Sequence, residues 1–478
     1  MPEPHACKGT GLAWTEGHRN DLLELSKKIW EFPELGLEER RSSKLIVDFL
    51  SNQGFSVDKD LAGMPTAFIA AWGSGKPVIG INCEYDALPG LSQEAVLKKQ
   101  PVVPGAPGHG CGHNLLGPGG AGAAAALKAV MEKHGLPGTI KVLGAPAEEI
   151  CIGKPFMARA GLFKGFDAII DWHPFYLNRV LYDTCNAYFS LKFHFKGRTG
   201  HGNSPWEGCS ALDSAILMGH AIELLREHIF PGDPTAANTI NYTFPDVGPE
   251  YPNVVPDRAT LWCVGRIQTV DQMEPIMAQI KRCAEGAALS TGTEVAEEVI
   301  SATHERIPNA VLAGVMHRNL VALGVPSYTP EEETFARGLQ KSCNAPQIGM
   351  DREIQPLGPG SAGVSDNSEY SWFAPFVMGC MACAPGGMGW HNWQVNAAAN
   401  SALGWKGMIL AVNVLMATGV YLLLDERLIK EAHEEFKKRM GGREYQPLFP
   451  AETPVPLEIN RQTMEKYRPL MDEKVWKG

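Results

Sequence analysis

His109-Gly110-Cys111-Gly112-His113-Asn114 holds two side chains that can bind a metal, Cys111 and His113, one residue apart between glycines. Glycine tolerates backbone angles that other residues avoid, so this spacing is typical of a tight loop that turns two side chains toward one point. A thiolate and an imidazole that converge there can hold a transition metal. A glycine-rich turn with a buried thiol and a structural histidine is the alternative, and other residues must decide between the two.

Acidic and metal-binding side chains also follow three apolar runs of the sequence. Each run is expected to form a strand, and the first is nearly all apolar, as expected of a strand buried on both faces. The runs are 78–83, before Glu84-Tyr85-Asp86, 139–146, before Ala147-Glu148-Glu149, and 168–173, which ends in His173. Ligand sites in open α/β sheets lie beyond the carboxyl ends of the strands, so we expect these residues to meet at one edge.

Together with the opening loop, these strand ends supply a candidate set of five metal ligands: Cys111, His113, Glu149, His173 and His391. Five ligands exceed what one closed tetrahedral site needs, whereas two metals that share a water or hydroxide would use them all. Glu148 is adjacent to a candidate ligand and is free to act as a general base, which takes a proton from the water and returns it to a leaving amine.

The pattern of expected strands and helices changes near residue 188 and again near residue 308, which predicts two domains. Residues 1–187 and 309–478 are expected to form one discontinuous α/β catalytic domain, with two helices within 18–53 and another that begins near Gly117 with a face of small residues. Residues 188–308 are expected to be inserted into it as a lid and dimerisation domain. Their β-α-β-β-α-β order resembles the ferredoxin-like pattern. The expected strands lie near 189–195, 238–244, 259–267 and 294–303, and the helices near 210–228 and 270–289.

Composition restricts the partners and the location. The net charge is −10, and Lys and Arg are scattered, which excludes a nucleic-acid partner. Eleven cysteines in a long chain, with no signal-peptide pattern at the start, favour the reducing cytoplasm. The apolar run 407–424 is about long enough to span a membrane but contains Asn413, Thr418 and two glycines. We therefore expect a buried core helix there.

Six motifs in the same order resemble those of the aminoacylase and carboxypeptidase superfamily of two-metal amidohydrolases. The nearest branch is the one that holds p-aminobenzoyl-glutamate hydrolase and the indole-acetyl-amino-acid hydrolases. The motifs are Trp30-Glu31-Phe32-Pro33-Glu34-Leu35-Gly36, Asp86-Ala87-Leu88-Pro89, His109-Gly110-Cys111-Gly112-His113-Asn114, Pro146-Ala147-Glu148-Glu149, Gly200-His201-Gly202-Asn203-Ser204-Pro205 and Asn253-Val254-Val255-Pro256-Asp257.

The resemblance implies a two-domain metallopeptidase-like fold, a homodimer and two divalent ions, Mn²⁺ or Zn²⁺, on the five candidate ligands. It implies that Glu148 is the general base and that Asp86 orients a ligand imidazole. His201 would stabilise the oxyanion, reaching across the dimer. Asn253 and Arg266 would bind a carboxylate of a small-molecule substrate.

Some positions depart from the family pattern. Asn114 stands where many relatives have Asp, and Gly110 stands where Ala is usual. The loop Gly363–Tyr370 follows the corresponding family loop only loosely, and Asp366 is taken as its acidic residue. These departures concern the substrate more than the type of reaction.

Three functions are consistent with these residues. The first is hydrolysis of the amide of a small aromatic, carboxylate-bearing substrate, such as an N-acyl amino acid or p-aminobenzoyl-glutamate. The second is hydrolytic deamination of an aromatic amine, such as a nitro-substituted aminobenzoate. The third is a non-catalytic protein that binds metal or ligand, against which the intact Glu148 argues.

Overall fold

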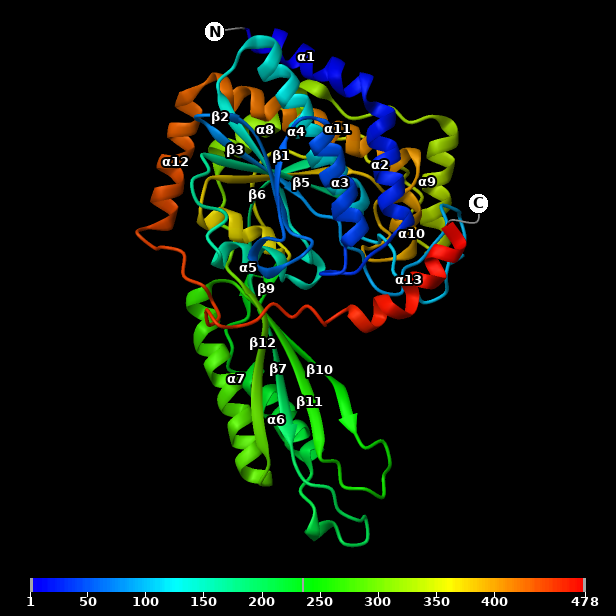
Figure 1. The fold of residues 1–478 in the computed structure, drawn as a ribbon, viewed down its shortest axis with the longest axis vertical. Helices are drawn as coiled ribbons and strands as arrows, with labels where there is room; N and C mark the ends of the chain where they lie inside the picture. The colour runs from blue at the N-terminus through cyan, green and yellow to red at the C-terminus, as the bar shows by residue number, and fades with distance from the viewer. Residues whose placement is uncertain (1–2, 234–235, 476–478) are drawn as a thin grey trace.

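Two sheets lie end to end in the computed structural model, which describes residues 3–233 and 236–475 (Figure 1). The larger sheet has eight strands in the order β1-β2-β4-β3-β5-β14-β6-β13. Their bounds are β1 Ser56–Lys59, β2 Phe68–Ser74, β4 Gly138–Gly144, β3 Val78–Cys83, β5 Ala168–Phe175, β14 Phe376–Ala382, β6 Arg179–Cys185 and β13 Pro359–Ala362. The neighbours β4, β3, β5 and β14 run parallel, so their carboxyl ends share one edge of the sheet.

Helices surround the large sheet, as Figure 1 shows. They are α1 Pro4–Gly17, α2 Arg19–Glu31, α3 Arg40–Asn52, α4 His113–His134, α5 Gly153–Arg159, α8 Ala310–Leu323, α9 Pro330–Ser342, α10 Trp393–Ala399, α11 Ala402–Leu424, α12 Glu426–Met440 and α13 Arg461–Val475. The two helices expected within 18–53 are confirmed as α2 and α3. Helix α1 was not predicted, because its buried residues, Cys7, Gly11 and Thr15, are small or polar and form no apolar pattern.

Helix α4 lies on β3, β4 and β5 and against α11. It begins at His113, four residues before the expected start, and the small-residue face predicted for it is confirmed. A Cβ added at Gly120 would lie 2.2 Å from the backbone oxygen of Asn82, in β3. Glycine at this position therefore lets the helix approach the sheet, and with it the first residue of the helix approaches the strand ends.

Helix α11 contains the apolar run 407–424, which is about long enough to span a membrane. It has 23 residues and a mean hydropathy of 2.1, so by length and composition alone it resembles a spanning helix. However, 89% of that apolar window is buried inside the protein, against α4, α8 and β14. The prediction of a buried core helix is confirmed.

The second sheet has four antiparallel strands in the order β10-β11-β7-β12, the ferredoxin-like order. Its elements are β7 Ala187–Lys196, α6 Ala211–Arg226, β10 Thr239–Gly248, β11 Arg258–Ile267, α7 Val270–Thr291 and β12 Glu294–Thr303. A two-stranded pair, β8 Gly232–Asp233 and β9 Ala236–Ala237, precedes β10. The exact domain limits at 188 and 308 stay a prediction.

We expect Gly120→Ala to lower the free energy of unfolding by about 1–3 kcal/mol, because the added methyl group meets backbone that cannot move aside. Gly286→Ala in helix α7 is the matched control. A Cβ there meets nothing within 4 Å, so this change is expected to stabilise by about 0.5–1 kcal/mol. Urea unfolding of both variants measures the difference. Equal effects of the two changes would contradict the close packing of α4 on β3.

Candidate metal centre and catalytic pocket

The five predicted ligands converge at the carboxyl ends of the parallel strands. Cys111, His113 and His173 each offer a ligand atom within 4.8 Å of the others, and so do Cys111, Glu149 and His391. Sγ of Cys111 lies 3.6 Å from Nε2 of His173, and Oε2 of Glu149 lies 3.4 Å from Nε2 of His391. Cys111 belongs to both groups, so two ions could share its sulfur.

Local backbone geometry turns these side chains toward each other. Gly112 has φ 83° and precedes the first residue of helix α4, which is His113. His391 itself has φ 59°, and Ala147, before the Glu148-Glu149 pair, has φ 56°. Such left-handed angles are costly for residues other than glycine, and strained residues of this kind cluster at functional sites. Cys111 thus lies in a glycine-rich loop, as predicted from the sequence.

Asp86 holds two of the candidate ligands in place. Its Oδ1 lies 2.8 Å from Nδ1 of His113, and its Oδ2 accepts a hydrogen bond of 2.9 Å from the backbone N–H of Glu149. With Nδ1 engaged, Nε2 of His113 faces the ligand groups and is buried without a hydrogen-bond partner. Oε1 of Glu149 is likewise buried without a partner. Because these two buried atoms have no hydrogen-bond partner, they are suited to bind a cation.

The chemistry of the donor set fits a divalent transition metal. Burial, and next the charge of Glu149, raise the pKa of the Cys111 thiol, so a bound cation would be needed to form the thiolate. Burial and the neighbouring His113 lower the pKa of His173 to about 4, which keeps this imidazole neutral, as a ligand must be. Nε1 of Trp390 donates to Sγ of Cys111 at 3.3 Å.

Glu148 lies beside the ligands as a buried carboxylate. Its Oε2 is 3.8 Å from Nε2 of His113. Burial, and next the negative charge of Glu84, raise its pKa to about 7. A carboxylate with such a pKa can both accept and return a proton near neutral pH, which is what a general acid–base group requires.

A buried lysine beside this centre was not predicted. The side chain of Lys154 is fully buried, and its Nζ contacts Oε1 of Glu84 at 2.8 Å and also Oδ1 of Asp366. Burial alone would raise the pKa of Glu84, but the charge of Lys154 lowers it to about 2. Oε2 of Glu84 lies 3.6 Å from Nε2 of His113, so Lys154 and Asp366 support the centre through Glu84. The sequence signals for this arrangement were Glu84 and Asp86 after β3 and Asp366 in the loop Gly363–Tyr370.

A pocket of about 560 Å³ opens over the candidate ligands. Cys111, Glu148, Glu149, His173 and His391 line it, together with the aromatic side chains of Phe175, Tyr176 and Trp390. Arg266, on β11, and Tyr188, on β7, line it from the four-stranded sheet. The structure therefore brings Arg266 to the metal centre, as expected from the sequence.

His201 and Asn253 do not line this pocket. They are exposed and neighbour each other: His201 forms a β-bridge with Val254, and the backbone N–H of Gly202 donates to the carbonyl of Asn253 at 2.7 Å. They belong to the loops β7–α6 and β10–β11, at the end of the insert farthest from the large sheet (Figure 1). Within one chain, the structure does not bring these two residues to the metal centre.

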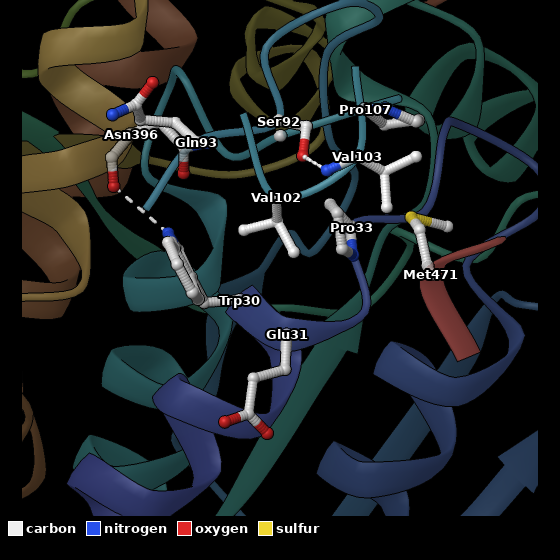
Figure 2. A pocket seen from close by; sticks show the side chains of 11 residues that line it. Trp30, Glu31, Pro33, Ser92, Gln93, Val102, Val103, Pro107, Asn396 and Met471 are labelled. Atoms are coloured by element: carbon white, nitrogen blue, oxygen red, sulfur yellow. Dashed lines mark hydrogen bonds between the residues drawn. The ribbon is translucent and has the colours of Figure 1, made fainter. Parts of the chain in front are cut away.

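Hydrogen bonds beside a second pocket, of about 50 Å³, connect loops near the centre to helices (Figure 2). Nε1 of Trp30, in α2, donates to the carbonyl of Asn396, in α10, at 3.0 Å. Nδ2 of Asn396 donates to the carbonyl of Leu91 at 2.6 Å. Helix α10, which begins two residues after His391, thus binds both helix α2 and the segment at Leu91 that precedes Cys111.

We expect Asp86→Asn to weaken Zn²⁺ binding about tenfold to a hundredfold, because the amide cannot orient both His113 and the Glu149 backbone as the carboxylate does. Asp48→Asn, on the exposed side of α3, is the control and should bind Zn²⁺ as tightly as the unaltered chain. Competition titration with a chelator measures both. An unchanged affinity in Asp86→Asn would remove Asp86 from the support of the centre.

Comparison with known proteins matches residues 80–402 to the model of peptidase family M20/M25/M40. The chain is 33% identical to one of the subunits of p-aminobenzoyl-glutamate hydrolase from Escherichia coli strain K12, over 93% of this chain and 98% of that protein. It is 31% identical to the Xaa-Arg dipeptidase of Mus musculus, over 88% of this chain and 89% of that protein.

A solved structure supports the architecture. The Bacillus subtilis YXEP protein, a dinuclear metal-binding peptidase of family M20, has a TM-score of 0.51 and 20% identity to this chain. The match covers 84% of this chain and 99% of that one. The expected metallopeptidase-like α/β fold is confirmed. The chain belongs to peptidase family M20/M25/M40 and is a metal-dependent hydrolase that acts on carbon–nitrogen bonds.

Proposed function

We propose that the substrate is a small aromatic amide that bears a carboxylate, of the N-acyl amino acid or p-aminobenzoyl-glutamate type. The observation that carries this proposal is the pocket itself, which Glu148, four of the five candidate ligands and Arg266 line together. Phe175 and Trp390, with ring centroids 5.4 Å apart, line the same space and suit a flat acyl group. The similar enzyme from Escherichia coli is named for such an amide.

We further propose two divalent ions, Mn²⁺ or Zn²⁺, one for each group of ligands, with Cys111 common to both. When bound, such ions polarise the amide carbonyl and lower the pKa of water. The Bacillus subtilis protein of similar fold binds two metals. The mixed thiol, imidazole and carboxylate donors of this chain are ligands that Zn²⁺ accepts.

The chain's own residues supply the remaining steps. A carboxylate oxygen of Glu148 takes a proton from the attacking water and then delivers it to the nitrogen of the leaving amine. The guanidinium of Arg266 pairs with the carboxylate of the amine half and so orients the scissile bond. Asp86 and the Glu84–Lys154 pair keep His113 in place during the reaction.

Hydrolytic deamination of an aromatic amine is the second candidate, because the aromatic wall of the pocket would also accept a flat amine. The similar proteins are named as a p-aminobenzoyl-glutamate hydrolase subunit and an Xaa-Arg dipeptidase, which favours amide hydrolysis over deamination. The third function expected from the sequence, a binding protein without activity, is not proposed, because the chain belongs to a family of hydrolases and has the buried Glu148 beside the candidate ligands. To decide, the metal-loaded protein is incubated with aromatic amides and aromatic amines, and the products are identified by mass spectrometry with an ammonia assay. Free amino acid without ammonia supports amide hydrolysis, whereas ammonia with a phenol would contradict it.

We expect Glu148→Gln to reduce kcat about a hundredfold to ten-thousandfold, because glutamine cannot accept the proton, while the bound metal content stays unchanged. Glu149→Gln is the matched variant, since the neighbouring carboxylate is a candidate ligand and its loss should reduce the metal content. Elemental analysis and turnover are measured on the same samples. Normal turnover in Glu148→Gln would exclude Glu148 as the base.

We also propose a homodimer in which His201 and Asn253 reach the pocket of the partner subunit. Both lie exposed on loops remote from their own metal centre. Glu148→Gln and His201→Ala chains are therefore co-expressed with different tags and purified as a mixed dimer. One site of that dimer has both residues intact, so about half of the native activity is expected. A mixed dimer no more active than its parents would exclude action across the dimer.

We propose a cytoplasmic location. All eleven cysteines are free, including pairs of thiols as near in sequence as Cys380 and Cys383. Free thiols in this number are typical of a reducing compartment.

A further inference from the structure

The side chain of Glu39 is completely buried and binds the turn that leads into Glu148. Its Oε1 accepts a hydrogen bond of 2.7 Å from the backbone N–H of Ala147, and its Oε2 accepts one of 2.9 Å from the hydroxyl of Thr66. Both oxygens thus accept from neutral groups, and one of these groups is the backbone directly before the candidate general base.

The backbone of Ala147 needs this support. Ala147 is buried and left-handed, with φ 56° and ψ 41°, a conformation that is unfavourable for alanine and persists only where the surroundings fix it. A Cβ added at Gly36 would lie 2.8 Å from both Cα and Cβ of Ala147, so glycine lets the segment before Glu39 lie directly against the turn. Without Glu39, the buried N–H of Ala147 would lose its acceptor, which is costly.

Glu39 is itself held by packed elements. It directly precedes helix α3, and its carbonyl accepts the N–H of Ser43 at 2.9 Å, in the first turn of that helix. Ile46 and Leu50, on the same helix, are completely buried, and the helix contacts α4 and β1. Thr66 lies shortly before β2. The carboxylate therefore joins the turn after β4 to a packed helix and to the chain before β2.

Asp86 supports the same turn at a different point. It accepts the N–H of Glu149, so the N–H groups before and after Glu148 are each bound by a buried carboxylate. Asp86 also contacts the imidazole of a candidate ligand, whereas the two groups that donate to Glu39 are not candidate ligands. Loss of Glu39 is therefore expected to displace Glu148 more than it disturbs the metal ligands.

We propose that Glu39 is a positioning residue for catalysis, which fixes the carboxylate of Glu148 in the pocket by holding the left-handed backbone of Ala147. A general base must lie within hydrogen-bond reach of the water that it deprotonates, and a displacement of about 1 Å can slow a reaction about a hundredfold. The inference rests on the role of Glu148 proposed above and adds the group that positions this base.

We expect Glu39→Leu to lower kcat about tenfold to a hundredfold, with KM and the bound metal content unchanged, because leucine fills most of the space but accepts no hydrogen bond. Glu39→Gln keeps an acceptor for the N–H of Ala147 and should restore most of kcat. Thr66→Val is the matched control, since it removes the other hydrogen bond of the same carboxylate and should also keep most of kcat. Hydrolysis of p-aminobenzoyl-glutamate by the full-length, metal-loaded protein and elemental analysis are measured on the same samples.

A second comparison separates positioning from general damage to the fold. In a Glu148→Gln background no base is left to be positioned, so the addition of Glu39→Leu should lower kcat by less than about twofold. Damage to the fold would instead lower kcat by the same factor in both backgrounds. Glu39→Asp, which is one methylene shorter and withdraws the carboxylate from the N–H of Ala147, takes the place of the leucine variant if that variant does not fold.

Equal losses in the two backgrounds would overturn the inference and leave amide hydrolysis intact. Loss of bound metal in Glu39→Leu, or a Glu39→Gln variant as slow as Glu39→Leu, would overturn it as well. Normal turnover in Glu148→Gln would exclude the proposed base instead, and failure of the native protein to hydrolyse any aromatic amide would overturn the proposed function.

Discussion

The carboxylate of Asp86 is the constraint on which the centre depends. One of its oxygens lies at Nδ1 of His113, and the other accepts the backbone N–H of Glu149. The same side chain therefore joins the end of β3, the first residue of α4 and the turn after β4. Because each of these three elements is packed into the core, the candidate ligand atoms are held in position, and a metal that binds there would impose little reorganisation.

The cost of this arrangement is a concentration of buried charge, which the fold compensates locally. Glu84 and Asp366 lie on either side of the fully buried Lys154, so three charges that would each be unfavourable alone satisfy one another.

Much of the centre could be predicted from sequence, because its residues follow strands that are recognisable by their apolar runs. Parallel strands bring their carboxyl ends together, so the positions of Glu149 and His173 followed from the pattern alone. Lys154 carried no such signal. A lysine outside a motif is normally exposed, and only the packing of distant segments buries this one. Helix α1 was not predicted for a related reason, because its buried face consists of small and polar residues.

The central claim is that one edge of the parallel sheet holds two metal ions between five side chains. Diffraction data collected at the absorption edges of manganese and zinc, from crystals grown with each metal, test it most directly. The account predicts two anomalous peaks about 3.5–4 Å apart, one beside His113 and His173, the other beside Glu149 and His391, with Cys111 between them. A single peak, or peaks that leave Cys111 uncoordinated, would contradict it.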